Sequence, residues 1–594
     1  MNCNSVSGKN WISKSYNEEK VVFLKENFNL SEILSKLIAI RNIKNDQVKL
    51  FLNPKIKSLL PNPFILKDME KAVKRTFDAI INNESIGIFG DYDVDGATST
   101  AILGNYFTEI NIKINPYIPD RKEEGYGPNI HGFEKLISAG SKLIFTVDCG
   151  TLSFETISYA KKKNIDVLVL DHHQSEINLP EAFSIVNPNR HDEQSDLKYL
   201  CAAGVCFMFL VGLNSKLREY NWFNKNNINE PNLMKYLDLV SLGTVCDVVP
   251  LIGLNRAIVT QGLEIIKKKS NLGLKTLKNL CGIESNINTY HLGYVLGPRI
   301  NAGGRVGKCS HGANLLLSKD SKEVFKIASE LELYNKQRKI IENEMLNKIE
   351  KNIKINAEEP VIVLSGHNWH GGIIGIVAGR LKEKYNKPAV IISVENGIGK
   401  ASARSIFGFD IGKIIISAVQ NNILKKGGGH KMAGGFTVDE NKIEEFKNYI
   451  TKKFLNIKNN LNKNNLMFFD SVISPSALNE NFFSEINSLS PFGSGNPEPR
   501  FVIEGLELIK SSIVGEKHIK SLFSAKDGSV IQSVTFNALK TELESYLLSN
   551  KRKKINIFGK LSLNEWKGRK NVEFIIDDIS VNKTINNSVP SSNG

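Results

Sequence analysis

The sequence predicts an α/β protein with a large parallel-sheet domain, a long connecting helix, a smaller α/β domain and a terminal β-barrel. Strand-like and helical stretches alternate from about residue 64 to 250, which is typical of a parallel sheet covered on both faces. Residues 321–355 contain neither proline nor glycine, and five strand-like runs follow residue 499. The expected segments are 1–63 (helical), 64–320, 321–355 (connecting helix), 356–458, 459–585 and a disordered tail, 586–594.

Length and composition favour a cytoplasmic protein with a polyanionic partner. The 594 residues allow three or four domains, and 41% of them are hydrophobic. No apolar run approaches the roughly 20 residues of a membrane span, and the first residues lack a signal core. Seven scattered cysteines fit a reducing compartment. The net charge of +15 suits a polyanion, although Lys, Asn and Ile are abundant throughout the chain.

The first domain is expected to contain four strands, with helical stretches such as 154–163 between them. Pro116 interrupts the second strand and predicts an edge position, because proline cannot donate to a strand ladder. The expected strands are 86–89, 112–117, 143–147 and 167–170. Polar residues fall repeatedly at the carboxyl ends of these strands, where ligand sites of open α/β sheets gather.

Residues 90–96, Gly-Asp-Tyr-Asp-Val-Asp-Gly, place three carboxylates directly after the first of these strands. Acids this close repel one another unless a cation lies between them. Asp-x-Asp-x-Asp-Gly also opens a calcium-binding EF-hand loop, but that loop needs a preceding helix and a Glu where this chain has Ile102. A calcium loop or a solvated acidic turn is therefore the alternative to a catalytic metal site.

Three further loops carry candidate ligands. Asp148 follows the strand at 143–147, and Asp-His-His follows the strand at 167–170. Asp247 follows a helical stretch at 233–242. One such Asp is commonly a turn residue or helix cap, but we expect all four loops at one edge of the sheet. Carboxylate and imidazole ligands suit Mn²⁺ or Mg²⁺, and no thiolates are placed to select zinc.

These four motifs resemble those of the DHH phosphoesterase superfamily, and residues 90–96 resemble the version in RecJ-type single-strand exonucleases. Pyrophosphatase-like members carry a His before the first acids, where this chain has Phe89. The resemblance, from about residue 64 to 580, implies two metal ions that activate a water on a phosphate. The ligands it implies are Asp93, Asp95, Asp148, His172 and Asp247.

The resemblance also implies supporting roles around the ions. Asp91 would support the metal shell, with capping of the next helix as its alternative. His173 would contact the phosphate or assist proton transfer. In the polar loop at 119–127, Arg121 would hold a phosphate and Tyr126 would stack on a base; otherwise both are surface residues.

Two glycine-rich segments are expected to approach a binding partner closely, the first an anion, and the second segment is expected to be a loop. Residues 297–305 carry Arg299, Asn301 and Arg305, and their alternative is a tight connector. In the second α/β domain, strands are expected at 361–364, 389–393 and 400–405, with a helix at 373–384. Residues 427–435 follow, with five glycines around a His and a Lys, and resemble the DHHA1 domain. The residues this implies as phosphate contacts are Ser402, Arg404 and His430.

The C-terminal runs suit an OB-fold barrel, which RecJ-type enzymes carry at this position. They lie at 500–503, 521–524, 530–536, 555–558 and 572–576, after an Asn- and Lys-rich linker at 456–465. Single-strand contacts are expected from Lys517, His518 and Lys520, and from Trp566 with Lys567 and Arg569.

The resemblance implies a metal-dependent exonuclease that degrades single-stranded DNA from 5′ to 3′ into 5′-mononucleotides during recombination and repair. A single-strand binding protein or a helicase would be a partner, and the chain would act as a monomer without a membrane. Two alternatives remain: a DHH enzyme acting on short oligonucleotides or small phosphates, and a binding scaffold that has lost its metals.

Overall fold

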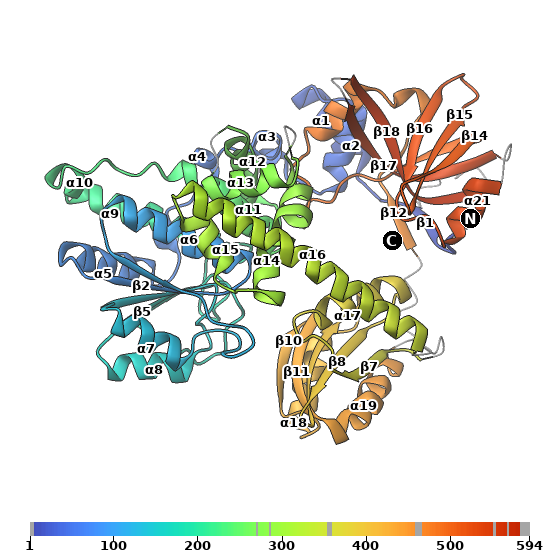
Figure 1. Ribbon diagram of the computed structural model, residues 1–594. Coiled ribbons are helices and arrows are strands. Elements are labelled where there is room, and N and C mark those ends of the chain that lie inside the picture. Colours follow the sequence, from blue (N-terminus) through green and yellow to red (C-terminus); the bar gives the residue numbers. More distant parts are fainter. Residues whose placement is uncertain are drawn as a thin grey trace. The chain divides into compact units, whose positions relative to one another are not determined.

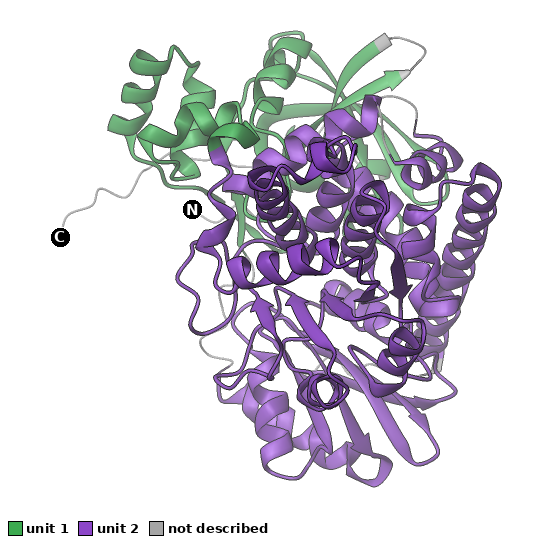
Figure 2. Ribbon diagram, turned by 90° about the vertical axis from the view of Figure 1, so that its left-hand side faces the viewer, with its two compact units in different colours: residues 1–58, 463–594 green, residues 59–462 purple. Residues whose placement is uncertain are grey.

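The structure is a computed structural model, which describes residues 5–268, 271–283, 287–352, 359–457, 466–549, 554–566 and 569–581. The chain divides into two compact units (Figure 2), one of Met1–Ser58 with Lys463–Gly594 and one of Leu59–Asn462. Among the described helices, none combines the length and the apolar character that crossing a bilayer requires. The expected tail and most of the expected linker lie outside the described residues.

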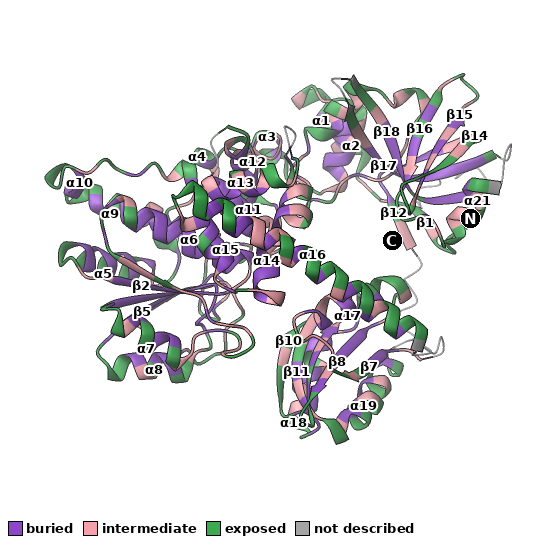
Figure 3. Cartoon of the chain, viewed as in Figure 1, coloured by how far each residue is buried: buried purple, intermediate pink, exposed green. Residues whose placement is uncertain are grey.

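The larger unit begins with the predicted parallel sheet, in the order β3-β2-β4-β5-β6. Every residue of β2 and β4 is buried, which explains their continuous apolar sequences (Figure 3). The strand with Pro116 is indeed at an edge. The fifth strand was not predicted, since three residues are too few to show a pattern. The strands are β2 (Ile86–Gly90), β3 (Ile114–Tyr117), β4 (Leu143–Val147), β5 (Asp166–Leu170) and β6 (Ser184–Val186).

Helices cover both faces of this sheet (Figure 1). On one face lie α7 (Ile130–Ser138) and α8 (Phe154–Lys162), and on the other α6 (Val94–Glu109) and α9 (Ala202–Glu219). Helix α6 is buried along nearly its whole length because α9, α11 and α15 also pack against it. The other helices of this part are α5 (Met69–Ile81), α10 (Trp222–Lys225), α11 (Leu237–Cys246), α12 (Gly253–Lys268), α13 (Leu272–Leu280) and α15 (His311–Leu317).

The glycine-rich segment at 297–305 forms a helix, so it is not the tight connector that the sequence left open as the alternative. Helix α14 (Gly297–Val306) continues directly from a π-helical turn, η4 (His291–Leu296). Its glycines permit close packing: a Cβ on Gly297 would lie 2.5 Å from the Cys246 Sγ, and one on Gly304 3.0 Å from the Tyr92 ring. Helix α16 (Ser321–Asn352) then packs first against α13, α14 and α15 and later against α17 (Ile374–Tyr385).

The second α/β part contains a sheet in the order β10-β11-β9-β8-β7. Residues 427–435 form a two-stranded hairpin here, so the prediction of a glycine-rich loop was wrong. Their glycines let α18 approach the hairpin, since a Cβ on Gly434 would lie 2.5 Å from the Ile415 side chain of α18. The elements are β7 (Ile362–His367), β8 (Ala389–Glu395), β9 (Ile398–Arg404), β10 (Lys426–His430), β11 (Ala433–Asp439), α18 (Ile411–Gln420) and α19 (Ile443–Leu455).

The smaller unit contains the predicted barrel. Its five strands run in the order β14-β15-β16-β18-β17, and pairing of β14 with β17 closes it. The strands are longer than expected: β14 (Phe501–Val514), β15 (His518–Ser524), β16 (Val530–Thr535), β17 (Lys554–Trp566) and β18 (Arg569–Val581). The short strand β13 (Ser471–Val472) pairs with β14, and α20 (Glu480–Asn487) and α21 (Glu542–Ser549) lie in the same part of the chain.

The N-terminal segment shares the hydrophobic core of the barrel. Leu24 and Leu37 are fully buried in one cluster with Phe501 and Phe574. Strand β1 (Asn10–Ser13) pairs in parallel with β12 (Leu466–Phe469). The sequence suggested only a small helical preface, because its pattern cannot show which distant surface a helix covers. Its helices are α1 (Glu18–Phe28), α2 (Glu32–Ile40), α3 (Val48–Leu52) and α4 (Ile56–Leu59).

Candidate metal centre

Asp93 begins helix α6 at the carboxyl end of β2. Its Oδ1 accepts hydrogen bonds from the backbone N–H groups of Asp95 (2.9 Å) and Gly96 (3.1 Å). Asp93 is therefore the helix cap, a role that the sequence analysis considered for Asp91. A strand precedes these acids rather than the helix that an EF-hand requires.

Asp95 is fixed by the start of a second helix. Its Oδ2 accepts from the Ala202 N–H (2.7 Å) and its Oδ1 from the Ala203 N–H (3.0 Å), at the first residues of α9. The side chain is 1% exposed. Each carboxylate oxygen has a second lone pair, so Asp95 is both held in place and still able to bind a cation.

The imidazole of His172 lies among three acids. Its Nε2 is 3.2 Å from the Asp148 Oδ1 and 3.8 Å from the Asp95 Oδ2, and its Nδ1 is 3.5 Å from the Asp247 Oδ2. Asp148 and His172 follow β4 and β5, as predicted. Asp247 instead caps the C-terminus of α11, so one of the four motifs comes from a helix end and not from the sheet.

Unpartnered buried atoms at this cluster fit a bound cation. The Oδ1 atoms of Asp91 and Asp148 and the Nε2 of His172 are buried and have no hydrogen-bond partner among the described residues. Buried polar atoms almost always have one. Three ligand groups have suitable spacing: Asp148-His172-His173, Asp95-His172-Asp247 and Asp91-Asp93-Asp148.

The electrostatics of the cluster also favour positive charge. Burial, and after it the neighbouring acids, raise the pKa of Asp91 and Asp148 well above the usual range. Burial together with Asp95 and Asp93 raises the pKa of Asp247 to about 9, and burial lowers the pKa of His172. Carboxyl groups that lie close together without a counter-charge have raised pKa values, and a bound divalent cation would lower the pKa values of these carboxyls.

His173 is held by Asp171. The Asp171 Oδ1 lies 2.8 Å from the His173 Nδ1 and also accepts from the N–H groups of His172 and His173. Although burial opposes the shift, Asp171 raises the pKa of His173 to about 9. The other ring nitrogen, Nε2, is 3.3 Å from the Tyr126 hydroxyl. His173 thus offers a proton at the edge of the acid cluster.

The sequence did not show that three residues hold the Asp-His-His loop in position. Asp171 was recognised only as part of its motif. The Asn187 side chain donates to the His173 carbonyl oxygen (2.8 Å), and the Asn189 side chain donates to the His172 carbonyl oxygen (2.6 Å). No pattern in the sequence connects these asparagines with a loop 14 to 17 residues earlier.

Three of the predicted phosphate contacts lie within electrostatic range of one another. Burial and then Arg121 lower the pKa of Arg404, and burial with Arg121, Arg338 and Arg404 lowers that of Arg305 to about 10. The Arg305 Nη1 donates to the Gly372 carbonyl oxygen (3.1 Å), and the Arg404 Nη1 donates to the Ser402 Oγ (3.2 Å). An anion between these guanidinium groups would relieve their mutual repulsion.

Other predicted contacts are placed differently. Arg299 forms an ion pair with Glu332 on α16 and donates to the Val295 carbonyl oxygen. Asn301 is half-buried on α14, and His430 is exposed at the end of β10.

The barrel residues belong to the other unit. Lys517 lies in the turn before β15, His518 accepts from the Asn537 N–H, and Lys520 is paired with Glu573. Lys567 and the side chains of Trp566 and Arg569 lie outside the described residues.

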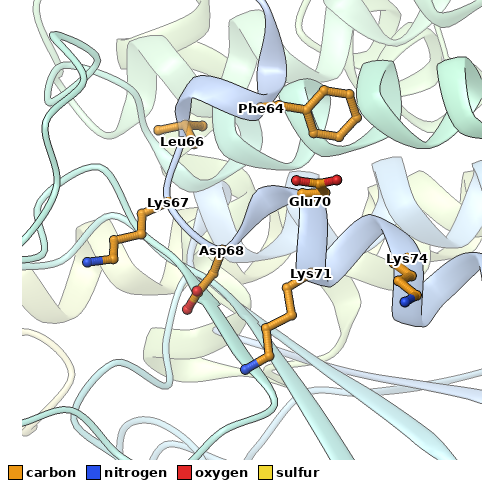
Figure 4. Close-up of a pocket in the computed structure, with 7 residues that line it drawn as sticks. All are labelled: Phe64, Leu66, Lys67, Asp68, Glu70, Lys71 and Lys74. Atoms are coloured by element: carbon orange, nitrogen blue, oxygen red, sulfur yellow. The ribbon is translucent and has the colours of Figure 1, made fainter.

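A pocket of about 430 Å³ at the start of α5 is separate from the metal centre (Figure 4). It contains none of the acids described above. Three lysines and two acids are among its lining residues, which are Phe64, Leu66, Lys67, Asp68, Glu70, Lys71 and Lys74.

Comparison with known proteins places the chain in a family. Residues 85–244 match the DHH family N-terminal domain, 358–456 the DHHA1 domain, and 469–578 the RecJ OB domain. The single-stranded-DNA-specific exonuclease RecJ of Salmonella typhimurium is 33% identical over 564 residues, covering 93% of this chain and 96% of that protein. The chain belongs to the RecJ family. RecJ of Bacillus subtilis is 32% identical over 580 residues, which are 96% of this chain and 71% of that protein.

Solved RecJ structures have the same fold. The crystal structure of Thermus thermophilus RecJ in complex with Mn²⁺ aligns with a TM-score of 0.78 at 26% identity, covering 97% of this chain and 80% of that one. Another exonuclease RecJ, bound to manganese, aligns with a TM-score of 0.55 at 31% identity over 66% of this chain and 95% of that one. The predicted order of DHH, DHHA1 and OB domains is confirmed.

Proposed function

We propose that this RecJ-family chain is a metal-dependent exonuclease that hydrolyses single-stranded DNA. The observation that carries the proposal is the set of three unpartnered buried atoms, on Asp91, Asp148 and His172, within a cluster of acids. The relatives' printed names, and the Mn²⁺ and Mg²⁺ in RecJ crystal structures, support the same substrate and metals.

Two ions fit the ligand groups. Asp95, His172 and Asp247 would hold one, and Asp91, Asp93 and Asp148 the other. Bound ions of this kind lower the pKa of a coordinated water and offset the charge of the scissile phosphate. Asp93 and Asp95 keep their positions because backbone N–H groups at the starts of α6 and α9 donate hydrogen bonds to their carboxylates. This rigidity fixes where the cations, and with them the phosphate, are located.

The chain's own residues supply the remaining chemistry. His173, protonated and oriented by Asp171, would present its Nε2–H to a phosphate oxygen or to the leaving group. Arg121, Arg305 and Arg404 would bind phosphates, with Ser402 and His430 completing the contacts. Tyr126 would stack on a base beside His173.

The finer features of the activity rest on the family resemblance. They are the 5′→3′ direction, release of 5′-mononucleotides and work in recombination and repair. A single-strand binding protein or helicase as a partner, a monomeric state and a cytoplasmic location belong to the same proposal. Lys517, His518 and Lys520 of the barrel would hold the strand beyond the active site.

Digestion of end-labelled nucleic acids tests this function. With Mn²⁺ or Mg²⁺ we expect a 5′ label on single-stranded DNA to be released first as a mononucleotide, while duplex DNA and RNA persist. Asp93→Ala should abolish the release, because it removes both a metal ligand and a helix cap. Asp78→Ala, an exposed acid on α5, is the matched control. Equal cleavage of dinucleotides and long strands would favour a small-substrate phosphoesterase instead.

A further inference from the structure

Two exposed tyrosines lie stacked on the π-helical turn that precedes α14. Tyr290 and Tyr294 have ring centroids 5.3 Å apart and planes inclined by 25°. They are 60% and 74% exposed, although neighbouring Leu292 and Leu296 on the same turn are fully buried. The pair thus presents aromatic surface to solvent in a preformed arrangement, and neither the metal centre nor the core uses it.

This turn is attached to the metal centre. The Cys246 Sγ, in the residue before Asp247, donates to the Leu292 carbonyl oxygen (3.4 Å). A Cβ on Gly293 would lie 3.5 Å from the Val245 side chain. At the other end of the same continuous helix, Gly304 packs against Tyr92, between Asp91 and Asp93. The helix therefore runs along the acid cluster, and the tyrosines lie at its Asp247 end.

The backbone departs from regular geometry on both sides of this contact. A π-helical turn is rare and is found preferentially at functional sites. Across from it, Val248 adopts a φ of 61°, a strained conformation for a β-branched residue. Its side chain is exposed, so no apolar packing explains the strain. Both irregularities lie where the turn that carries the tyrosines contacts Val245 and Cys246, the two residues before Asp247.

Two of the residues proposed to contact phosphates follow on the same helix. Asn301 and Arg305 lie 7 and 11 residues beyond Tyr294, or about 10 and 16 Å along a helix axis. Proteins that bind single strands combine cations that follow the backbone with aromatic rings on which bases stack. We propose that Tyr290 and Tyr294 form a stacking platform for an unpaired base of the strand whose phosphates lie at Arg305. This inference rests on the proposed single-strand substrate.

Equilibrium binding tests the platform in a full-length Asp93→Ala background, which keeps the strand intact. The probe is a labelled single-stranded oligonucleotide, and fluorescence anisotropy in Mg²⁺ gives its Kd. Tyr294→Ala should raise the Kd by roughly 5- to 150-fold, the range for loss of one stacked base. Tyr290→Ala/Tyr294→Ala should bind at least as weakly. Tyr294→Phe and Tyr294→Trp should retain the affinity, because the ring and not the hydroxyl stacks.

A scan with abasic sites separates stacking from a change in folding. A set of oligonucleotides, each lacking one base at a different position, is bound to the Asp93→Ala protein that keeps both tyrosines. Removal of the base should weaken binding at one or two of these positions. The same positions should have no effect in Tyr294→Ala. Tyr220→Ala is the matched control: this ring is 47% exposed but packs on Phe77 at the end of α9, so both Kd and scan should be unchanged.

Two results would overturn the platform: a double variant whose Kd rises less than about twofold, or an abasic profile that the tyrosine variants leave unchanged. Either result would leave the exonuclease proposal intact if the unmutated chain degrades single strands. Failure of the exonuclease proposal would appear separately, as an absence of metal-dependent hydrolysis in a chain with both tyrosines.

Discussion

At the scale of single residues, the features that make the acid cluster a metal-binding site also lower the stability of the metal-free folded protein. Asp148 is 2% exposed, its Oδ1 has no hydrogen-bond partner in the described part of the chain, and its backbone adopts a φ of 60°. Each of these features costs free energy in the metal-free protein. A bound ligand would offset this cost. A substitution that removes the cost should therefore raise the stability of the metal-free protein while it lowers activity.

Asp148→Asn should therefore stabilise the metal-free protein while it abolishes activity. We expect the free energy of unfolding in EDTA to rise by on the order of 1 kcal/mol, because one buried charge among like charges is removed. Hydrolysis should fall by at least about 1,000-fold, since a metal ligand is lost. Denaturant titration and a nuclease assay measure the two effects. Asp78→Asn should change neither, and lower stability of Asp148→Asn would contradict the account.

The pH dependence of stability should reveal the same crowding. The pKa of Asp247 is about 9 in the folded chain and ordinary in the unfolded one, so the folded state holds the extra proton and loses stability as pH rises toward 9. His173, also raised to about 9, contributes stability that is lost over the same range. In EDTA the free energy of unfolding should fall between pH 6.5 and 9, by at most about 1.4 kcal/mol per pH unit for each group.

Saturating Mg²⁺ should flatten this pH dependence, because the ions bind the ionised carboxylates. Asp247→Asn should reduce the slope in EDTA. Denaturant titrations at three pH values with and without Mg²⁺ provide the measurement. Stability that increases with pH in EDTA would mean that these acids are not crowded.

Residue types and spacing were enough to find the acids and histidines, because a chemical motif is local in sequence. Asp93, Asp95, Asp148, His172 and Asp247 converge as predicted. Supporting residues escaped notice because their roles depend on the fold. Asn187 and Asn189 position the loop by donating to the carbonyl oxygens of His173 and His172, which only the fold brings close to them.

At the scale of elements, glycine was the main source of error. Residues 427–435 were predicted as a loop, and they form a hairpin. Residues 297–305 were predicted to bring backbone N–H groups close to an anion, and they form a helix. In both segments the missing Cβ serves close packing against a neighbour, which a single sequence does not distinguish from backbone freedom. The positions of β2, β4 and β5 were predicted well, because their continuous apolar runs directly reflect burial on both faces of the sheet.

The buried carboxylate of Glu342 on α16 forms an ion pair with α17, and we expect its removal to lower the stability of the protein. Glu342 binds Arg338 (2.6 Å) within α16 and Arg380 (3.1 Å) on α17. Glu342→Ala would leave the buried Arg338 guanidinium without this carboxylate and should cost about 3–5 kcal/mol. Glu350→Ala removes an exposed pair with Lys384 between the same helices and should cost less than about 1 kcal/mol. Denaturant titration compares them, and equal losses would refute a buried role for Glu342.

At the scale of the whole molecule, the N-terminal segment and the barrel form one folding unit. Leu37 of α2 is fully buried in the core that contains Phe501 of β14 and Phe574 of β18. The sequence suggested a separate helical preface, since its own residues show amphipathic helices but not their partner. Contacts across more than 450 residues are beyond what local periodicity can show.

Leu37→Ala should weaken the barrel by about 2–5 kcal/mol, the usual cost of a cavity in a core. Hydrogen exchange followed by mass spectrometry should show faster exchange in peptides of β14 and β18. Val22→Ala, at an exposed position of α1, should leave that exchange unchanged. Unaltered exchange in the Leu37 variant would show that the segment folds independently of the barrel.

The central claim is that acids and an imidazole from separate parts of the chain bind a pair of cations. Anomalous diffraction at the manganese edge, from crystals grown with Mn²⁺, tests it most directly. The account predicts two peaks, one among Asp95, His172 and Asp247 and the other among Asp91, Asp93 and Asp148. Ordered side chains at these positions with no anomalous peak among them would contradict it.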